Sequence, residues 1–132
     1  MGIGYKIDFE RNGVYIKFSE KLTGNDLIQI NKLLYSYDQF ETMKYQLWDY
    51  TNTKEILITE EEVEIIGVLD KAASRWNNSM LVALVGKSDE FASLIEIYKK
   101  EISEIDWTCV MFNELDSARL WLNNNLTSKI NS

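Results

Sequence analysis

Two continuous apolar stretches, each followed by an amphipathic helical pattern, constrain the fold of this chain more than any other feature. They are MLVALVG at residues 80–86 and WTCVMF at residues 107–112. A short run that is apolar at every position is typical of a strand covered on both faces. Strands that alternate with helices form parallel sheets with right-handed crossovers. The second half of the chain is therefore predicted to form βα units around a parallel sheet.

The start of the chain predicts a β-hairpin. YKIDFE and VYIKFS alternate apolar and polar residues on either side of Asn12-Gly13. Asn-Gly between two alternating runs is a strong signal for a two-residue turn. A turn centred on Asn12 and Gly13 pairs Ile7 with Phe18 and places apolar side chains opposite one another.

Helical patterns fill the remaining intervals, around a further strand at 45–50. The expected first residues or caps of the four helices are Thr23 or Asn25, Thr59, Ser88 or Asp89, and Asn113. The second helix is predicted to bury an apolar face made of Ile65, Ile66, Leu69, Ala72, Ala73 and Trp76. Its charged residues are predicted to face solvent: Glu60, Glu64, Asp70 and Lys71.

The predicted fold is α/β, with an N-terminal β-hairpin followed by βα units. It has a five-stranded mixed sheet with four helices packed on it. The 132 residues suit one domain. We expect a single domain over 1–132, with its core at about 5–123 and a polar tail at 124–132.

Charge and composition narrow the range of partners. The net charge is −7, whereas proteins that bind phosphate backbones or anionic membrane surfaces present a basic face. Neither nucleic acid nor membrane insertion is expected, and a basic protein partner remains open. The one cysteine, Cys109, lies in an apolar run and is predicted to be a buried, inert thiol. This usage, with no secretory signal at the first residues, predicts a cytoplasmic location.

The sequence contains few of the residues and motifs that enzymes commonly use for catalysis. It has no histidine, which removes the commonest general base and the commonest zinc ligand. Neither a glycine-rich phosphate-binding motif nor a calcium-binding loop is present. No catalytic residue, cofactor or metal ligand is predicted.

Residues 47–63, LWDYTNTKEILITEEEV, join the third strand to the second helix. Asp49 and Thr51 stand near the end of that strand, where open α/β sheets bind ligands. Thr59 and Glu62 have the spacing of a capping box, and Glu60 lies where the helix dipole favours an acid. The segment therefore has two interpretations, a small polar site or a turn followed by a helix cap.

The same segment supplies the candidate functional residues. A candidate interaction or switch surface consists of Asp49, Tyr50, Thr51, Thr59, Glu60 and Glu64. Trp48 and Tyr50 flank Asp49, and exposure of one of these rings would suit a partner or an apolar ligand. Trp48 and Tyr50 are accordingly the candidate contacts for a small apolar ligand.

Several stretches resemble a known family. They are the apolar strand that ends at 85–86, CVMF at 109–112, NELDSARLWL at 113–122 and LWDYT at 47–51. With the order of the elements, these stretches resemble the SpoIIAA-like branch of the STAS family over about residues 5–123. That family includes anti-sigma-factor antagonists and the cytoplasmic tails of sulfate transporters.

The resemblance implies a phosphorylation site at the start of the helix after LWDYT, where antagonist members carry a serine. The matching place is residues 58–61, where only Thr59 could take a phosphate. The Asp and Gly of that motif are absent here. A phosphate on Thr59 would be favoured by the helix dipole and repelled by the neighbouring acids.

Three functions are expected in decreasing order. The first is a non-enzymatic STAS-like regulatory or protein-interaction module of the bacterial cytoplasm, with a protein partner or a second copy of itself. The alternative is a carrier of a small apolar or lipid-like ligand near Trp48 and Tyr50, because the family shares its architecture with lipid-binding SEC14-like domains. The third is a hydrolase or lyase that uses carboxylates such as Asp49.

Overall fold

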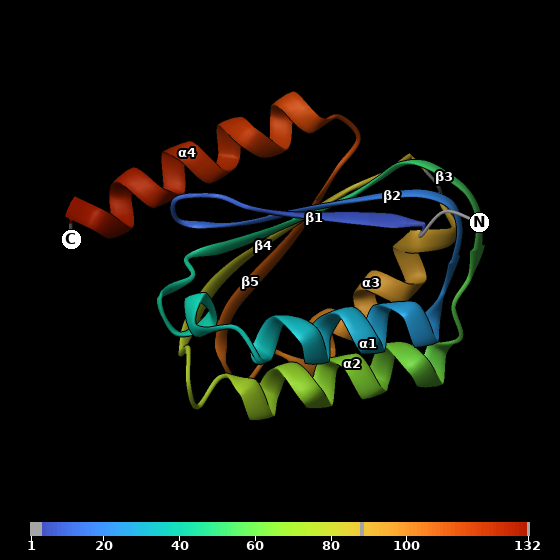
Figure 1. Ribbon diagram of the computed structural model, residues 1–132, viewed down its shortest axis with the longest axis horizontal. Coiled ribbons are helices and arrows are strands. Elements are labelled where there is room, and N and C mark those ends of the chain that lie inside the picture. Colours follow the sequence, from blue (N-terminus) through green and yellow to red (C-terminus); the bar gives the residue numbers. More distant parts are fainter. Residues whose placement is uncertain (1–3, 88, 132) are drawn as a thin grey trace.

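The computed structural model describes residues 4–87 and 89–131, and it contains the strands and helices that the sequence predicts (Figure 1). The elements are β1 (Tyr5–Phe9), β2 (Gly13–Thr23), α1 (Gly24–Tyr35), the short 3₁₀ helix η1 (Asp38–Thr42), β3 (Tyr45–Leu57), α2 (Glu60–Ala73), β4 (Ser79–Val85), α3 (Glu90–Glu101), β5 (Asp106–Phe112) and α4 (Leu115–Asn131). Ser88, one of the two predicted caps of α3, lies outside the described residues.

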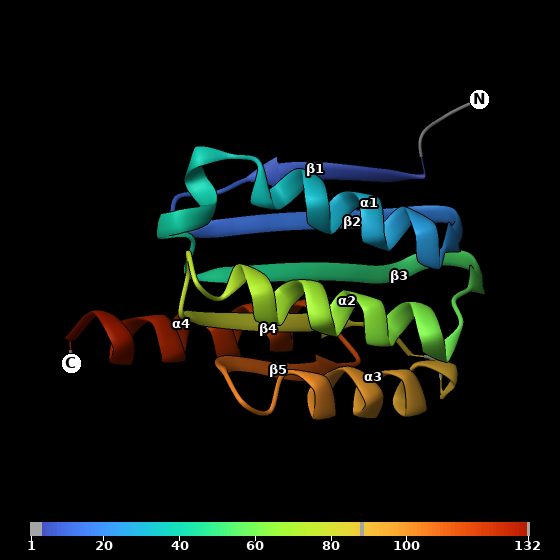
Figure 2. The same ribbon diagram turned by 90° about the horizontal axis from the view of Figure 1, so that it is seen from below.

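The five strands form one sheet in the order β1-β2-β3-β4-β5. β1 runs antiparallel to β2, and each remaining neighbouring pair is parallel. Helices α1, α2 and α3 cover one face of the sheet, and α4 crosses the other face alone (Figure 1 and Figure 2). The predicted α/β class, mixed sheet and four packed helices are confirmed.

The two faces of the sheet bury separate cores. The larger core lies under α1–α3 and includes Ile16, Phe18, Ile30, Trp48, Tyr50, Ile66, Met80, Phe91 and Tyr98. The smaller one lies under α4 and includes Tyr45, Leu47, Leu81, Ala83, Val85, Ala118 and Leu122. Because side chains alternate along a strand, β3 contributes to both cores from successive residues.

The β1–β2 hairpin forms, but its predicted register is wrong by two residues. Ile7 pairs with Ile16 instead of Phe18, and the turn is closed by backbone hydrogen bonds between Glu10 and Gly13. The shift by two keeps every side chain on its predicted face.

Gly13 explains the shift. It opens β2, has no positive φ, and lies so close to Tyr45 that a Cβ there would overlap the Tyr45 carbonyl and ring. The glycine is therefore required because β2 packs closely against β3 at this position, and not because the hairpin turn needs it.

β3 is much longer than the predicted strand at 45–50. Its pairing with β4 stops at Asp49 opposite Val85, but residues 52–57 continue beside β2 up to Leu57 opposite Thr23. The segment predicted as a polar loop after Asp49 is therefore the outer part of a two-stranded parallel ribbon. Its polar sequence reflects exposure to solvent and does not mark a turn.

Two further expectations need correction. The buried face of α2 consists of Val63, Ile66, Gly67, Asp70 and Ala73, so Asp70 is inside, whereas Ile65, Ala72 and Trp76 are exposed. The predicted polar tail at 124–132 is not a separate segment, because α4 continues to Asn131.

Candidate functional site

The candidate surface residues do not form one surface. Asp49 and Tyr50 are buried, with exposed fractions of 2% and 9%, and they point to opposite faces of the sheet. Trp48 is also buried, so neither aromatic ring beside Asp49 has the exposure that would suit contact with a protein partner. Thr51 is exposed on the ribbon.

Asp49 belongs to the α4 side of the sheet, and its carboxylate is fully engaged. Tyr15 donates its hydroxyl hydrogen to Oδ2 at 2.6 Å. Thr51 donates its backbone N–H and its hydroxyl to Oδ1 at 3.0 and 2.7 Å. Burial, followed by the bond to Asp49, raises the pKa of Tyr15. Three donors satisfy this buried acid without any cation.

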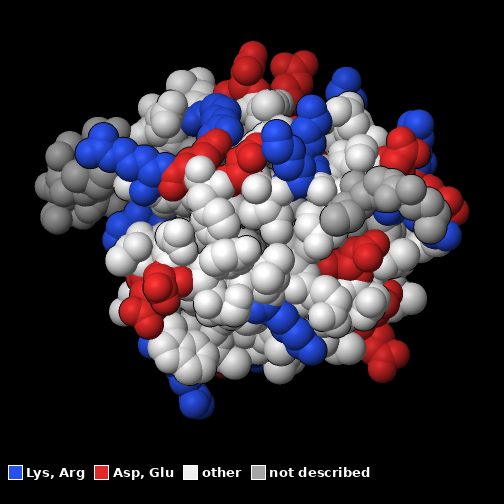
Figure 3. All heavy atoms as spheres, in the orientation of Figure 1, with Lys and Arg blue, Asp and Glu red and all other residues white. Residues whose placement is uncertain are grey.

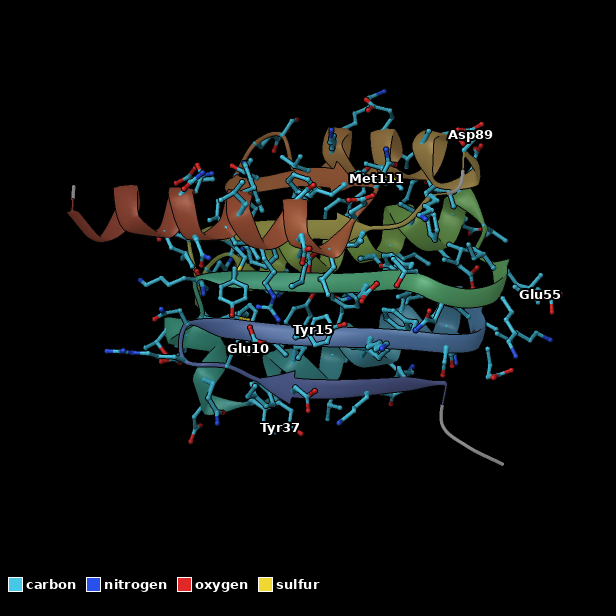
Figure 4. All side chains as sticks on the ribbon, turned by 90° about the horizontal axis from the view of Figure 1, so that it is seen from above. Glu10, Tyr15, Tyr37, Glu55, Asp89 and Met111 are labelled. Carbon is cyan, nitrogen blue, oxygen red and sulfur yellow. The ribbon has the colours of Figure 1, made fainter. Side chains whose placement is uncertain are left out.

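Arg119 joins α4 to the hairpin; its partners Glu10 and Tyr15 are labelled in Figure 4. Its guanidinium donates two hydrogen bonds to Glu10, at 2.6 and 2.8 Å, and lies 5.2 Å from the centre of the Tyr15 ring. Tyr45 also donates to Glu10. The bond to Arg119 is the main reason that the pKa of Glu10 is lowered. This cluster is structural, because each polar group in it already has a partner.

The start of α2 is the capping box that the sequence predicted. Thr59 Oγ1 accepts from the N–H of Glu62 at 3.2 Å, and the Glu62 carboxylate accepts from the N–H of Thr59 at 2.9 Å. Thr59, Glu60 and Glu64 are all exposed. The interpretation as a helix cap is therefore confirmed.

Exposed apolar side chains follow the outer side of α2 from this cap. Ile65 and Val68 are 42% and 53% exposed, and Trp76, just beyond the helix, is 63% exposed. With Ala72 between them, they make an outer stripe of α2 that begins beside acidic residues. On the face shown in Figure 3, basic and acidic side chains are interspersed around a neutral centre, without a basic stripe of the kind that nucleic acid requires.

A cavity of about 80 Å³ lies between the sheet and α1–α3, on the side that faces the viewer in Figure 2. It is lined by Leu27, Asn31, Gln46, Trp48, Tyr50, Ile58, Val63, Ile66, Asp70, Val82, Leu84, Phe91, Leu94, Ile95 and Tyr98. Trp48 and Tyr50, the candidate ligand contacts, are both among them. Ile58, Leu84 and Leu94 are only half-buried, so this end of the cavity lies nearest the surface.

Asp70 brings a carboxylate to this cavity. It is 2% exposed and accepts hydrogen bonds from Tyr35 on α1 and from Tyr98 on α3, the latter at 2.6 Å. Burial raises the pKa of Asp70 to about 6, and the two tyrosine bonds oppose that rise. Burial also raises the pKa of Tyr35 and of Tyr98. One acid therefore joins three helices.

Tyr50 presents a second polar group to the same cavity. Its ring stacks on Phe18, with centres 4.9 Å apart, and lies 4.8 Å from Phe91. No hydrogen bond to its hydroxyl is found within the described residues, although the side chain is nine-tenths buried. By contrast, the neighbouring Trp48 indole donates to Gln46 at 3.0 Å.

Asp70 and its partners were not predicted from the sequence, because this charged residue was expected on the solvent-facing side of α2. The spacing of Val63, Ile66, Asp70 and Ala73 on one helical face was the available signal. Among residues 4–87 and 89–131, no group of three or more metal-binding side chains is close enough to hold a metal ion. In the same part of the chain, no helix has the length and apolarity to cross a membrane.

The structure is similar to two solved proteins. One is the anti-sigma factor antagonist SpoIIAA in its unphosphorylated form, with a TM-score of 0.59, 9% identity and coverage of 91% of this chain and 97% of that one. The other is an uncharacterised DUF3478 protein from Shewanella loihica with a SpoIIAA-like fold, with a TM-score of 0.50, 18% identity and coverage of 89% and 91%. This chain therefore has the SpoIIAA-like fold that the sequence suggested.

Sequence comparison adds one relative. The superoxide dismutase 1 copper chaperone of Candida glabrata is 32% identical over 78 residues, which cover 57% of this chain and 33% of that protein. The chain thus spans about a third of the curated relative that it matches. The sequence matches no protein-family model.

Proposed function

We propose that this protein is a non-enzymatic regulatory module of the STAS type that binds a protein partner through the outer side of α2. The observation that carries the proposal is the outer stripe of α2, where Ile65, Val68 and Trp76 are exposed and no described part of the chain covers them. Exposed apolar groups that adjoin one another on one helix are typical of interaction sites.

The acidic residues at the start of α2 indicate a partner with a basic surface. Glu60, Glu61 and Glu64 are exposed at the start of the same helix, and the chain carries a net charge of −7. The partner that fits is a protein with an apolar centre bordered by lysine and arginine, because complementary charges speed association and suppress wrong partners. A second copy of this chain fits less well, since it carries the same net charge of −7.

The fold and the buried acids support this proposal. The chain is similar in fold, over 91% of its length, to an anti-sigma factor antagonist. Asp49, the carboxylate considered for a hydrolase or lyase, has both oxygens engaged by Tyr15 and Thr51. Thr59 Oγ1 is part of the cap of α2, so its phosphorylation would exchange that cap for a dianion beside Glu62. We retain the cytoplasm as the location of this module.

The test is affinity capture from the source cell, followed by sedimentation of the purified complex. Val68→Ser and Glu64→Lys should each release the partner, and added salt should weaken its binding. Leu120→Ser is the matched control, because Leu120 is 62% exposed on α4, which covers the other face of the sheet.

A stoichiometric partner with a basic surface that is lost from the α2 variants and kept by Leu120→Ser supports the proposal. Three outcomes contradict it. They are a monomer with no retained partner, equal loss from all variants, and self-association that Val68→Ser leaves unchanged.

A further inference from the structure

The cavity beside Asp70 has the features of a ligand site, separate from the α2 surface. Four aromatic rings line it, those of Trp48, Tyr50, Phe91 and Tyr98, together with aliphatic side chains. Its polar lining residues include Asn31 and Gln46, whose side chains bond to Leu27, Met43 and Trp48. The carboxylate of Asp70 and the hydroxyl of Tyr50 are the polar groups that the proposal uses. Binding pockets for small molecules commonly combine an apolar wall with a few convergent polar groups.

The carboxylate of Asp70 has no cationic partner. Within the described residues, no lysine or arginine lies at ion-pair distance from this carboxylate, and its two hydrogen bonds come from tyrosines. The ion pair next to it in sequence, Lys71 with Glu101 at 3.4 Å, is already complete. A buried acid without a cation is costly, and a cationic ligand that reached it would remove that cost.

Among the residues that line the cavity, Asp70 is the one with a charged side chain, and the charges of Lys99 and Glu96 on α3 act on Cys109 beside it. Tyr35 from α1 and Tyr98 from α3 bond to it, and Cys109 on β5 interacts with it electrostatically. Burial raises the pKa of both tyrosines, and it raises the pKa of Cys109 to about 12. All three are neutral at pH 7, so the groups that a ligand meets in the cavity include one carboxylate and four aromatic rings.

We propose that this cavity binds the methylated ammonium head of a small organic cation. Aromatic faces attract such heads through their quadrupoles. Both oxygens of Asp70 already accept a hydrogen bond, which favours a head that needs charge compensation and no further acceptor. A volume of about 80 Å³ is about half of the roughly 150 Å³ that accommodates benzene, and it suits a group of about four heavy atoms.

The unpaired hydroxyl of Tyr50 extends the recognition beyond the head. It is nine-tenths buried, lines the cavity, and has no bond within the described residues. A hydroxyl or carbonyl oxygen on the ligand would accept a hydrogen bond from this hydroxyl.

The experiment compares choline with its uncharged isostere 3,3-dimethylbutan-1-ol, titrated into the full chain at pH 7.5 and constant ionic strength. Binding is followed by calorimetry and by the NMR signal of the Trp48 indole N–H. Choline should bind at least about ten-fold more tightly than the isostere, the effect of a cation–π and charge contribution above about 1.4 kcal/mol. Equal affinity, or no binding of choline, overturns the proposal.

Variants then assign the site. Asp70→Asn should weaken choline binding by about ten-fold or more, and Tyr50→Phe by about three-fold, whereas Asp116→Asn on α4 should leave it unchanged. Should Asp70→Asn fail to fold, the pH dependence of the unaltered chain replaces it. Choline affinity should fall as the pH is lowered from 7.5 to 5, and affinity that is flat over this range contradicts the proposal.

Loss of choline binding in Asp70→Asn together with unchanged partner capture would separate this site from the α2 surface. Failure of the α2 proposal leaves the choline titration fully interpretable, because the two experiments share no variant.

Discussion

Asp49 and Asp70 are equally buried, at 2% exposure each, yet their carboxylates differ in hydrogen-bond donors and in packing on the two sides of the sheet. On the α4 side, Asp49 receives three hydrogen bonds from Tyr15 and Thr51, and an arginine–glutamate pair closes the cluster next to it. On the α1–α3 side, Asp70 receives two bonds from tyrosines and borders a cavity. The number of hydrogen-bond donors and the packing around a buried acid, and not its burial alone, decide whether it has a purely structural role or can also bind a ligand.

The largest expected contrast concerns packing. Phe18 lies between Trp48 and Tyr50, with ring centres 5.9 and 4.9 Å away, so Phe18→Ala should cost about 3–5 kcal/mol of unfolding free energy. Leu122→Ala, in the smaller core under α4, should cost about 2–3 kcal/mol. Urea denaturation measures both. Equal losses would mean that the two sides contribute equally to stability.

The next contrast is the pH dependence of stability, to which Asp70 and Glu10 contribute with opposite signs. The pKa of Asp70 is raised from 3.8 to about 6, so the unfolded chain loses this proton before the folded one does. Stability should fall by up to about 3 kcal/mol as the pH rises from 4 to 6. In Asp70→Asn, denaturation midpoints measured across this range should lack that component, and an unchanged profile would show that Asp70 does not titrate there.

Single hydroxyl deletions compare the two acids directly. Tyr98→Phe removes one of two donors to Asp70 in a fully buried setting and should cost about 1–2 kcal/mol. Thr51→Val removes one of three donors to Asp49 at an exposed residue and should cost about 0.5–1 kcal/mol. Thermal unfolding of both variants provides the measurement. A larger effect of Thr51→Val would reverse the comparison.

The smallest expected effect is that of Arg119→Ala, about 0.5–1 kcal/mol, because both partners of this ion pair are partly exposed. Arg119 lowers the pKa of Glu10 below 4.5, so the bond stabilises the folded chain at neutral pH and is lost as the pH falls through that lowered pKa. Urea titrations at a series of pH values below 7 should therefore show the deficit of Arg119→Ala shrinking as Glu10 becomes protonated. A deficit that stays constant over the whole series would assign the effect to lost packing on Tyr15.

Local patterns predicted most of the fold but little of the site. The apolar runs at 80–86 and 107–112 and the Thr59 capping box determine their elements through neighbouring residues, so the sequence was sufficient for them. The hairpin register depends on contact between Gly13 and Tyr45, 32 residues apart in sequence, which no local pattern records.

The same limit explains why the sequence placed Asp70 in solvent. Its donors come from two other helices, 35 and 28 residues away. Only the assembled helix layer shows that a charged residue on an apolar face has partners. The polar sequence of residues 51–57 was misleading for a different reason. Most residues of this ribbon are exposed to solvent, so the sequence lacks the alternation of apolar and polar residues that identifies a half-buried strand.

The bond between Glu10 and Arg119 joins residues 109 positions apart. During synthesis, the hairpin leaves the ribosome long before α4 exists. Leu47, Leu81 and Val85, which α4 covers in the complete chain, remain exposed to solvent during that interval. The opposite face of the sheet can already be covered by α1–α3. Nascent chains of this protein should therefore present a temporary apolar sheet face to chaperones until the last helix has been made.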